Sequence, residues 1–206
     1  AKYWLFSSMS LAVFILPKGS LVNDLVSWKE RIKNELPGQP YTSHPPHMTL
    51  INAELINEKD GIIAASAIIS SIKPFQISVK RKNIFWNDSF TKGHTLFFEV
   101  EYNHTLFELQ KSLAIALKPF KKRVSPPNNL IEDNAILESF QTYGFPFIGR
   151  HWKPHFSVAS LKTEKTDPII KDFLSKTNHY KFTVNQFSIW HINGDEHTQL
   201  KTLSFE

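Results

Sequence analysis

The chain of 206 residues contains no cysteine. This absence excludes disulfides, thiolate nucleophiles and cysteine-ligated zinc sites. No apolar run approaches the roughly 18 residues that a membrane-spanning helix needs, and no clear signal peptide or low-complexity segment is present. We therefore expect one domain over residues 1–206 that makes no contact with a membrane, resides in the cytoplasm and is a monomer.

The composition fits a packed domain that meets anions. Hydrophobic residues make up 41% of the chain and aromatic residues 13%, which is enough for a sizeable core. The formal net charge is +5, and a positive balance favours partners such as phosphate or nucleic acid.

The hydrophobic pattern predicts an α+β fold. Alternating segments predict strands and segments of period 3.6 predict helices. Helices are expected over residues 22–36, 59–72, 105–117 and 167–176. Strands are expected over residues 10–16, 47–53, 75–86, 95–102, 155–161, 182–192 and 199–205. A long connection over 121–153 includes a further helical stretch near 130–140.

The order of these elements is loosely duplicated, which indicates two pseudo-symmetric lobes. Each lobe would hold an antiparallel sheet backed by helices, with a central cleft between the lobes. Lobe one would cover about residues 18–104 and lobe two about 105–190, with the terminal strands exchanged or shared. The segment 182–192 would form a closing hairpin with 199–205.

One short motif occurs in each predicted lobe. Residues 46–50 read PHMTL and residues 154–158 read PHFSV, so each has proline, histidine, an apolar residue, a hydroxyl residue and an apolar residue. Residues two apart in a strand share a face. Each histidine should therefore lie beside a hydroxyl, while the apolar residues point into the core. The alternative is two ordinary strands that begin with Pro-His.

These paired motifs resemble those of the two-histidine (2H) phosphoesterase superfamily, in particular its 2′-5′ RNA ligase-like and cyclic nucleotide phosphodiesterase branches. The segments 11–17, 152–159 and 182–203 are also similar to that family's first strand, second motif and closing hairpin. The second motif carries Ser157 where many members have threonine, and the connection 121–153 is longer than a minimal member needs.

The resemblance implies a bilobal fold and metal-independent chemistry without a cofactor. His47, Thr49, His155 and Ser157 would be catalytic, acting on 2′,3′-cyclic phosphate ends of RNA or on cyclic nucleotides. Two histidines suit a general acid and a general base near neutral pH. The resemblance favours His155 as the base and His47 as the acid, and the hydroxyls would bind the nonbridging oxygens.

Further residues beside the second motif are candidates for binding substrate. Tyr143, Phe145 and Trp152 could stack on a base, and Arg150 and Lys153 could meet a phosphate. Core packing or solvent exposure is the alternative for each of them. Further possible cleft residues are Tyr41, Phe85 and Trp86.

Other histidines leave further alternatives open. A metal site built from His44, His47, His151 and His155 is conceivable, but acidic partners are absent nearby, so we expect no metal. His191 and His197 are expected at the surface. Rival functions are cleavage of 2′-5′ linked or cyclic oligonucleotides, RNA 2′-5′ ligation, and binding of RNA ends without turnover.

Overall fold

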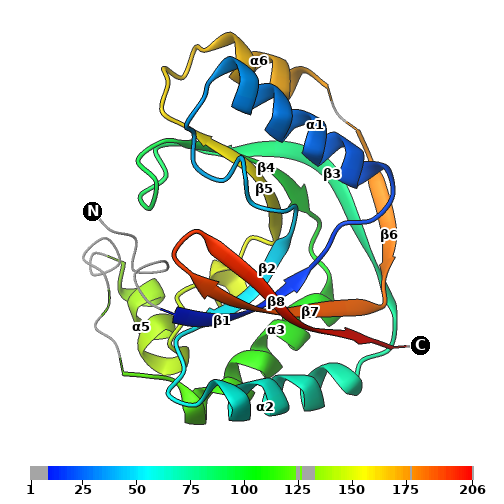
Figure 1. Ribbon diagram of the computed structural model, residues 1–206, viewed down its shortest axis with the longest axis vertical. Helices are drawn as coiled ribbons and strands as arrows, with labels where there is room; N and C mark the ends of the chain where they lie inside the picture. The colour runs from blue at the N-terminus through cyan, green and yellow to red at the C-terminus, as the bar shows by residue number, and fades with distance from the viewer. Residues whose placement is uncertain (1–8, 124–125, 127–132, 177, 206) are drawn as a thin grey trace.

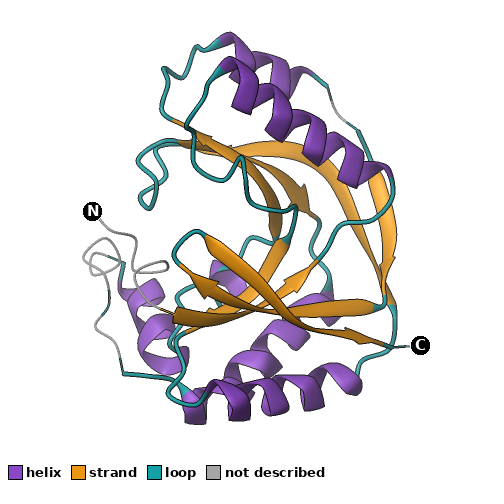
Figure 2. Ribbon diagram, viewed as in Figure 1, coloured by secondary structure: helices purple, strands orange, loops and turns teal. Residues whose placement is uncertain are grey.

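The protein was analysed as a computed structural model, which describes residues 9–123, 126, 133–176 and 178–205. Residues 1–8 and part of the connection 121–153 therefore lie outside the described residues. The structure has two four-stranded antiparallel sheets that face each other, and helices lie on their outer faces (Figure 2). This arrangement confirms the predicted α+β, two-lobe fold.

The two sheets draw their strands from distant parts of the chain. The first sheet has the order β2 (Met48–Ala53), β1 (Met9–Ile15), β7 (Gln186–Asn193) and β8 (Glu196–Ser204). The second sheet has the order β5 (His155–Leu161), β4 (His94–Val100), β3 (Phe75–Phe85) and β6 (Tyr180–Val184). Each histidine motif thus belongs to the outermost strand on one side of its own sheet, and these two outermost strands, β2 and β5, contact each other.

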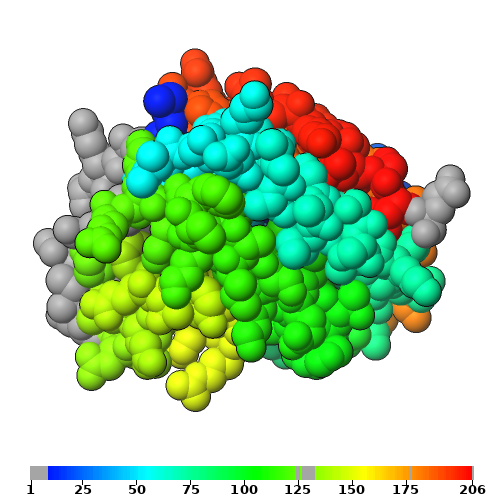
Figure 3. Space-filling view, turned by 90° about the horizontal axis from the view of Figure 1, so that it is seen from below, coloured from blue at the N-terminus to red at the C-terminus, as the bar shows by residue number. Residues whose placement is uncertain are grey.

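Helices cover the outer face of each sheet. The helices α1 (Ser20–Glu35) and α6 (Pro168–Ser175) lie over the second sheet (Figure 1). The helices α2 (Glu58–Ser70) and α3 (His104–Leu117) lie side by side under the first, and together with α5 (Asn134–Tyr143) they form the face seen from below in Figure 3. Short 3₁₀ helices η1 (Lys118–Phe120) and η2 (Gly149–His151) follow α3 and α5.

Side-chain caps explain where several helices begin. The side chains of Asn57, Asn103 and Asp167 accept hydrogen bonds from backbone N–H groups in the first turns of α2, α3 and α6. These caps satisfy N–H groups that have no partner within the helix. Within the described ranges, no helix is both long and apolar enough to cross a membrane.

Both motif strands carry a β-bulge at the same place in the motif. In β2, Val13 of β1 is paired with Ile51 and Phe14 with Thr49, so Leu50 is the extra residue. In β5, Leu96 of β4 is paired with Ala159 and Phe97 with Ser157, so the extra residue is Val158. A bulge bends its strand and redirects the adjacent side chains, and bulges are frequent beside active sites.

Two sequence-based expectations about the elements are wrong. The lobes do not separate near residue 104, because β3 and β4 pair with each other and with β5, and α1 also packs on that sheet. Residues 18–104 therefore contribute to both lobes. The expected strand 182–192 is also divided at Asn185, because β6 pairs with β3 whereas β7 pairs with β1 and β8.

Candidate functional site

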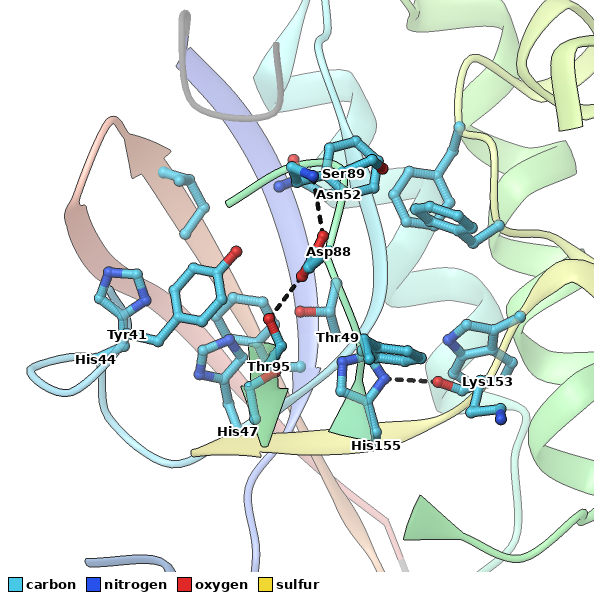
Figure 4. A pocket seen from close by; sticks show the side chains of 18 of the residues that line it. Tyr41, His44, His47, Thr49, Asn52, Asp88, Ser89, Thr95, Lys153 and His155 are labelled. Carbon is cyan, nitrogen blue, oxygen red and sulfur yellow. Dashed lines mark hydrogen bonds between the residues drawn. The ribbon is translucent and has the colours of Figure 1, made fainter. Parts of the chain in front are cut away.

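A pocket of about 500 Å³ lies between the two sheets, and both histidine motifs line it. Thr49 of β2 and His47 just before that strand enter it from the first sheet, and His155 and Ser157 of β5 enter it from the second. Figure 4 shows His47, Thr49 and His155 on neighbouring backbone segments. The volume falls within the range of small-molecule sites. The predicted grouping of the two motifs at one pocket is therefore present.

Both motif histidines are held by the same local hydrogen bond. Nδ1 of His47 lies 2.6 Å from the carbonyl oxygen of Pro45, and Nδ1 of His155 lies 2.6 Å from that of Lys153. A carbonyl oxygen can only accept a hydrogen bond, so each Nδ1 must carry the proton and donate it. The nitrogen left for a substrate is therefore Nε2, which can take up a proton as a base or release one as an acid.

Aromatic rings fix the orientation of each imidazole. Phe14 stacks on His47 with ring centroids 4.1 Å apart and an interplanar angle of 27°. Phe85 and Phe97 each meet His155 edge to face, at 5.1 Å. Such contacts are worth about 0.5–1.5 kcal/mol each beyond the buried area, so neither ring is free to turn.

The two bulges are braced by buried side chains from opposite lobes. Lys29 of α1 donates its Nζ protons to the carbonyls of Val158 (3.0 Å) and Tyr41 (2.7 Å). Gln110 of α3 donates its Nε2 protons to the carbonyls of Leu50 (3.1 Å) and Phe147 (2.7 Å).

These two braces have the same design. Lys29 donates to the bulge carbonyl of the second motif strand and to a carbonyl in the loop before the first motif. Gln110 donates to the bulge carbonyl of the first motif strand and to a carbonyl in the loop before the second motif. The loop containing Tyr41 precedes the first motif, and the loop containing Phe147 precedes the second. Lys29 and Gln110 therefore tie the two motifs to each other, which fixes their relative position.

Burial keeps the motif imidazoles neutral in the free protein. It lowers the pKa of His47 to about 3, against the opposing effect of its hydrogen bond to Pro45, and the charges of His197 and Lys29 lower it further. Burial also lowers the pKa of His155, and the charge of Lys153 adds to this effect, whereas the hydrogen bond to the Lys153 carbonyl and the carboxylates of Asp88 and Glu99 oppose it. The neighbouring carboxylates therefore favour a proton on His155, and among the described residues no carboxylate acts in this way on His47.

Asp88 is fixed on the side of the pocket that the second sheet contributes. Its carboxylate accepts hydrogen bonds from Thr95 Oγ1 (2.6 Å) and from the backbone N–H of Phe90 (2.9 Å). The hydrogen bond to Thr95 is drawn in Figure 4. Because Asp88 is held in this way, its negative charge stays at a constant position relative to His155.

The remaining predicted residues divide into two groups. Phe145, Trp152 and Lys153 line the pocket, as do the possible cleft residues Tyr41, Phe85 and Trp86. Tyr143 and Arg150 lie outside the lining. Tyr143 ends α5 and packs against the core, and Arg150 is exposed and hydrogen bonds to His151 at 3.5 Å. The structure does not bring these two side chains to the motifs.

The expectation that His197 is a surface residue is wrong. His197, at the start of β8 in the β7–β8 hairpin, lines the pocket together with His44. His191, by contrast, lies outside the lining and pairs with Glu58 at 2.9 Å. Within the described residues, no group of three or more histidine or acidic side chains is arranged to hold a metal ion, so His44, His47, His151 and His155 form no such group.

Sequence reasoning missed Lys29 and Gln110, although a signal was present. Lys29 lies on the helical face that includes Leu25 and Ile32, and Gln110 lies between Leu109 and Leu113. A polar residue on the apolar face of a helix needs a buried hydrogen-bond partner. That rule could have identified both residues as internal braces.

Comparison with known proteins gives the same fold. TT0787 of Thermus thermophilus aligns with a TM-score of 0.60 and 14% identity, over 95% of this chain and 97% of that one. Escherichia coli LigT complexed with 3′-AMP aligns with a TM-score of 0.53 and 13% identity, over 96% and 97% of the two chains. LigT complexed with phosphate aligns with a TM-score of 0.53 and 12% identity, over 97% of each.

The sequence itself matches a family model over most of its length. None of the curated protein sequences gives a significant match. The model described as "2'-5' RNA ligase superfamily" matches residues 20–196, which include both histidine motifs. The resemblance identified from the motifs is therefore confirmed, and the chain belongs to the 2′-5′ RNA ligase superfamily of two-histidine phosphoesterases.

Proposed function

We propose that this protein is a metal-independent phosphodiesterase that opens 2′,3′-cyclic phosphates at RNA ends or on small nucleotides. The observation that carries the proposal is the presence of two His-x-hydroxyl units, one from each sheet, in one pocket of nucleotide size. Members of the superfamily are enzymes that act on phosphodiester bonds. Escherichia coli LigT has been crystallised with 3′-AMP and with phosphate, and a 3′-phosphate is one product of ring opening.

The reaction needs two proton transfers. The oxygen of a water molecule attacks phosphorus and loses a proton to a base, while the bond from phosphorus to one ribose oxygen breaks. An acid gives its proton to that departing oxygen. One imidazole carries out each step, and after turnover the two rings exchange protons with solvent to regain their starting states.

The local charges favour His47 as the base and His155 as the acid. The Lys29 ammonium disfavours a proton on His47. The carboxylates of Asp88 and Glu99 favour a proton on His155, and the Lys153 ammonium opposes them. This assignment is the reverse of the one that the family resemblance implies. Thr49 and Ser157 would donate hydrogen bonds to the nonbridging oxygens, where negative charge builds up in the transition state.

The proposal is tested by hydrolysis of adenosine 2′,3′-cyclic phosphate, followed by phosphorus NMR. His47→Gln and His155→Gln should each lower the rate by about 10²–10⁴, the usual contribution of a general acid or base. The control is His179→Gln, an exposed residue outside the pocket lining, which should retain the wild-type rate.

Two outcomes would refute the proposal. One is the absence of hydrolysis by the wild-type protein between pH 5 and 9, and the other is retained activity in both motif variants. A 2′-5′ linked dinucleotide assayed alongside separates ring opening from the alternative cleavage of 2′-5′ linkages.

A further inference from the structure

His44 and His197 form a second pair of imidazoles on one side of the pocket. Their ring centroids lie 4.3 Å apart, and the centroid of His197 lies 5.7 Å from that of His47. The loop before β2 supplies His44, and the β7–β8 hairpin supplies His197. Neither residue belongs to a motif, so the proposed ring-opening reaction does not account for them.

His197 has the same hydrogen bond as the two motif histidines. Its Nδ1 lies 3.0 Å from the carbonyl oxygen of Asp195, two residues earlier. The carbonyl fixes the proton on Nδ1, so Nε2 is the nitrogen left for a ligand. A ring held in this way at a pocket wall is suited to meet a ligand atom at a fixed place.

The charge on this side of the pocket suits an anion. The Lys29 ammonium lies close enough to disfavour protonation of His44, His47 and His197. The carboxylate of Asp195 lies 3.7 Å from Nε2 of His44, but its side chain is 98% exposed and lies outside the pocket lining. The carboxylate that does line the pocket is that of Asp88, which is held by Thr95 of the second sheet. The opposite part of the lining is aromatic, with Phe85, Phe145, Phe147 and Trp152, and this surface suits a nucleobase rather than a phosphate.

We propose that His44 and His197 bind a second phosphate group of the substrate, one ribose away from the phosphate held by the motif histidines. The preferred ligand is then a nucleotide with a phosphate on each side of the same ribose, as at the 3′ end of an RNA chain. This inference rests on the proposed function for the identity of the first phosphate.

Binding of this second phosphate takes up a proton. Burial holds the pKa of His44 at about 4 and lowers that of His197, so both rings are neutral at pH 7 when the site is empty. A phosphate beside them favours the charged form, and Nε2 of His197 then becomes a donor. The charged or titratable groups that surround the pair are Lys29, Tyr41, His47 and Asp195.

The test compares two nucleotides that bind without turnover. Adenosine 3′,5′-bisphosphate and 3′-AMP differ only in the 5′-phosphate, and calorimetry gives the two dissociation constants. The wild-type protein should bind the bisphosphate at least about tenfold more tightly, since one hydrogen bond to a charged group contributes that much. The ratio should increase from pH 8 to pH 6.

His197→Gln and His44→Gln should each reduce this ratio toward one. His191→Gln is the matched control on the same hairpin, outside the pocket lining, and should keep the wild-type ratio. The dinucleotide ApAp, whose second phosphate links two nucleosides, determines whether a terminal or an internucleotide phosphate is preferred.

Equal affinities for the two nucleotides in the wild-type protein would overturn the proposal. The proposal would also be overturned if His197→Gln and His44→Gln both kept the wild-type ratio of dissociation constants, or if neither nucleotide bound to the wild-type protein. Because these are equilibrium measurements on non-reacting ligands, their result is distinguishable from a failure of the proposed hydrolysis.

Discussion

Replacement of Lys29 by methionine tests the brace between the two motifs. The ammonium group is buried, with 5% of the residue exposed, and it donates to the carbonyls of Val158 and Tyr41. Methionine is of similar length but has no donor. Lys29→Met therefore leaves two carbonyls without this donor and loosens the contact between the second motif strand and the loop before the first.

The pH dependence gives the magnitude of the effect. Burial lowers the pKa of Lys29 from 10.5 to about 8, so between these pH values the unfolded chain binds more protons at Lys29 than the folded chain does. The free energy of unfolding then rises with pH in that window. A shift of about 2.5 units at 1.36 kcal/mol per unit corresponds to about 3 kcal/mol.

The assay is urea unfolding of the wild type and Lys29→Met at pH 8 and at pH 10.5. The stability difference between wild type and variant should grow by about 3 kcal/mol at the higher pH. Lys33→Met, an exposed position on the same helix, should show no such growth. If the free energies of unfolding of wild type and Lys29→Met change by the same amount between the two pH values, burial does not lower the pKa of Lys29.

The same variant should also lose activity. A displacement of about 1 Å between reacting groups can cost about 10²-fold in rate, so kcat should fall at 25 °C while the variant remains folded. An unchanged kcat would show that Lys29 does not position the motifs.

Two further predictions concern the roles and charges of the motif histidines. The leaving group of a p-nitrophenyl phosphodiester needs little protonation. On this substrate, His155→Gln should regain much of its lost rate relative to wild type, and His47→Gln should not. Equal losses of rate in both variants would contradict the assignment of His155 as the acid. Because burial lowers the pKa of His155 below the ordinary value of 6.5 in the free protein, kcat/KM for adenosine 2′,3′-cyclic phosphate should already be falling with rising pH at pH 6.5. The bound phosphate favours the imidazolium, so the decline of kcat should begin at higher pH, and coincident profiles would contradict this reasoning.

The histidine motifs and the fold class could be predicted from the sequence because their signals are local. A histidine two residues before a hydroxyl in a strand fixes which side chains share a face, whatever the rest of the chain does. The pairing of strands is not local. Two consecutive polar residues, Asn185 and Gln186, shift the apolar alternation by one position between Val184 and Phe187. This shift marks a break, but it does not show that the two parts hydrogen bond in different sheets.

The position of His197 could not be read from the sequence for the same reason. It lies near the tip of a hairpin, where an exposed side chain is the usual expectation, and only the tertiary fold places it in the pocket lining near His47. The braces were hidden as well, because Lys29 bonds to Val158, a residue 129 positions away.

The central claim is that His47 and His155 act together on one phosphorus centre. The most direct test compares kcat for adenosine 2′,3′-cyclic phosphate in His47→Gln, His155→Gln and the double variant. Groups that act as one unit give strongly non-additive losses, so the double variant should be little slower than either single one. Losses that multiply in the double variant, or single variants that keep the wild-type rate, would contradict the account.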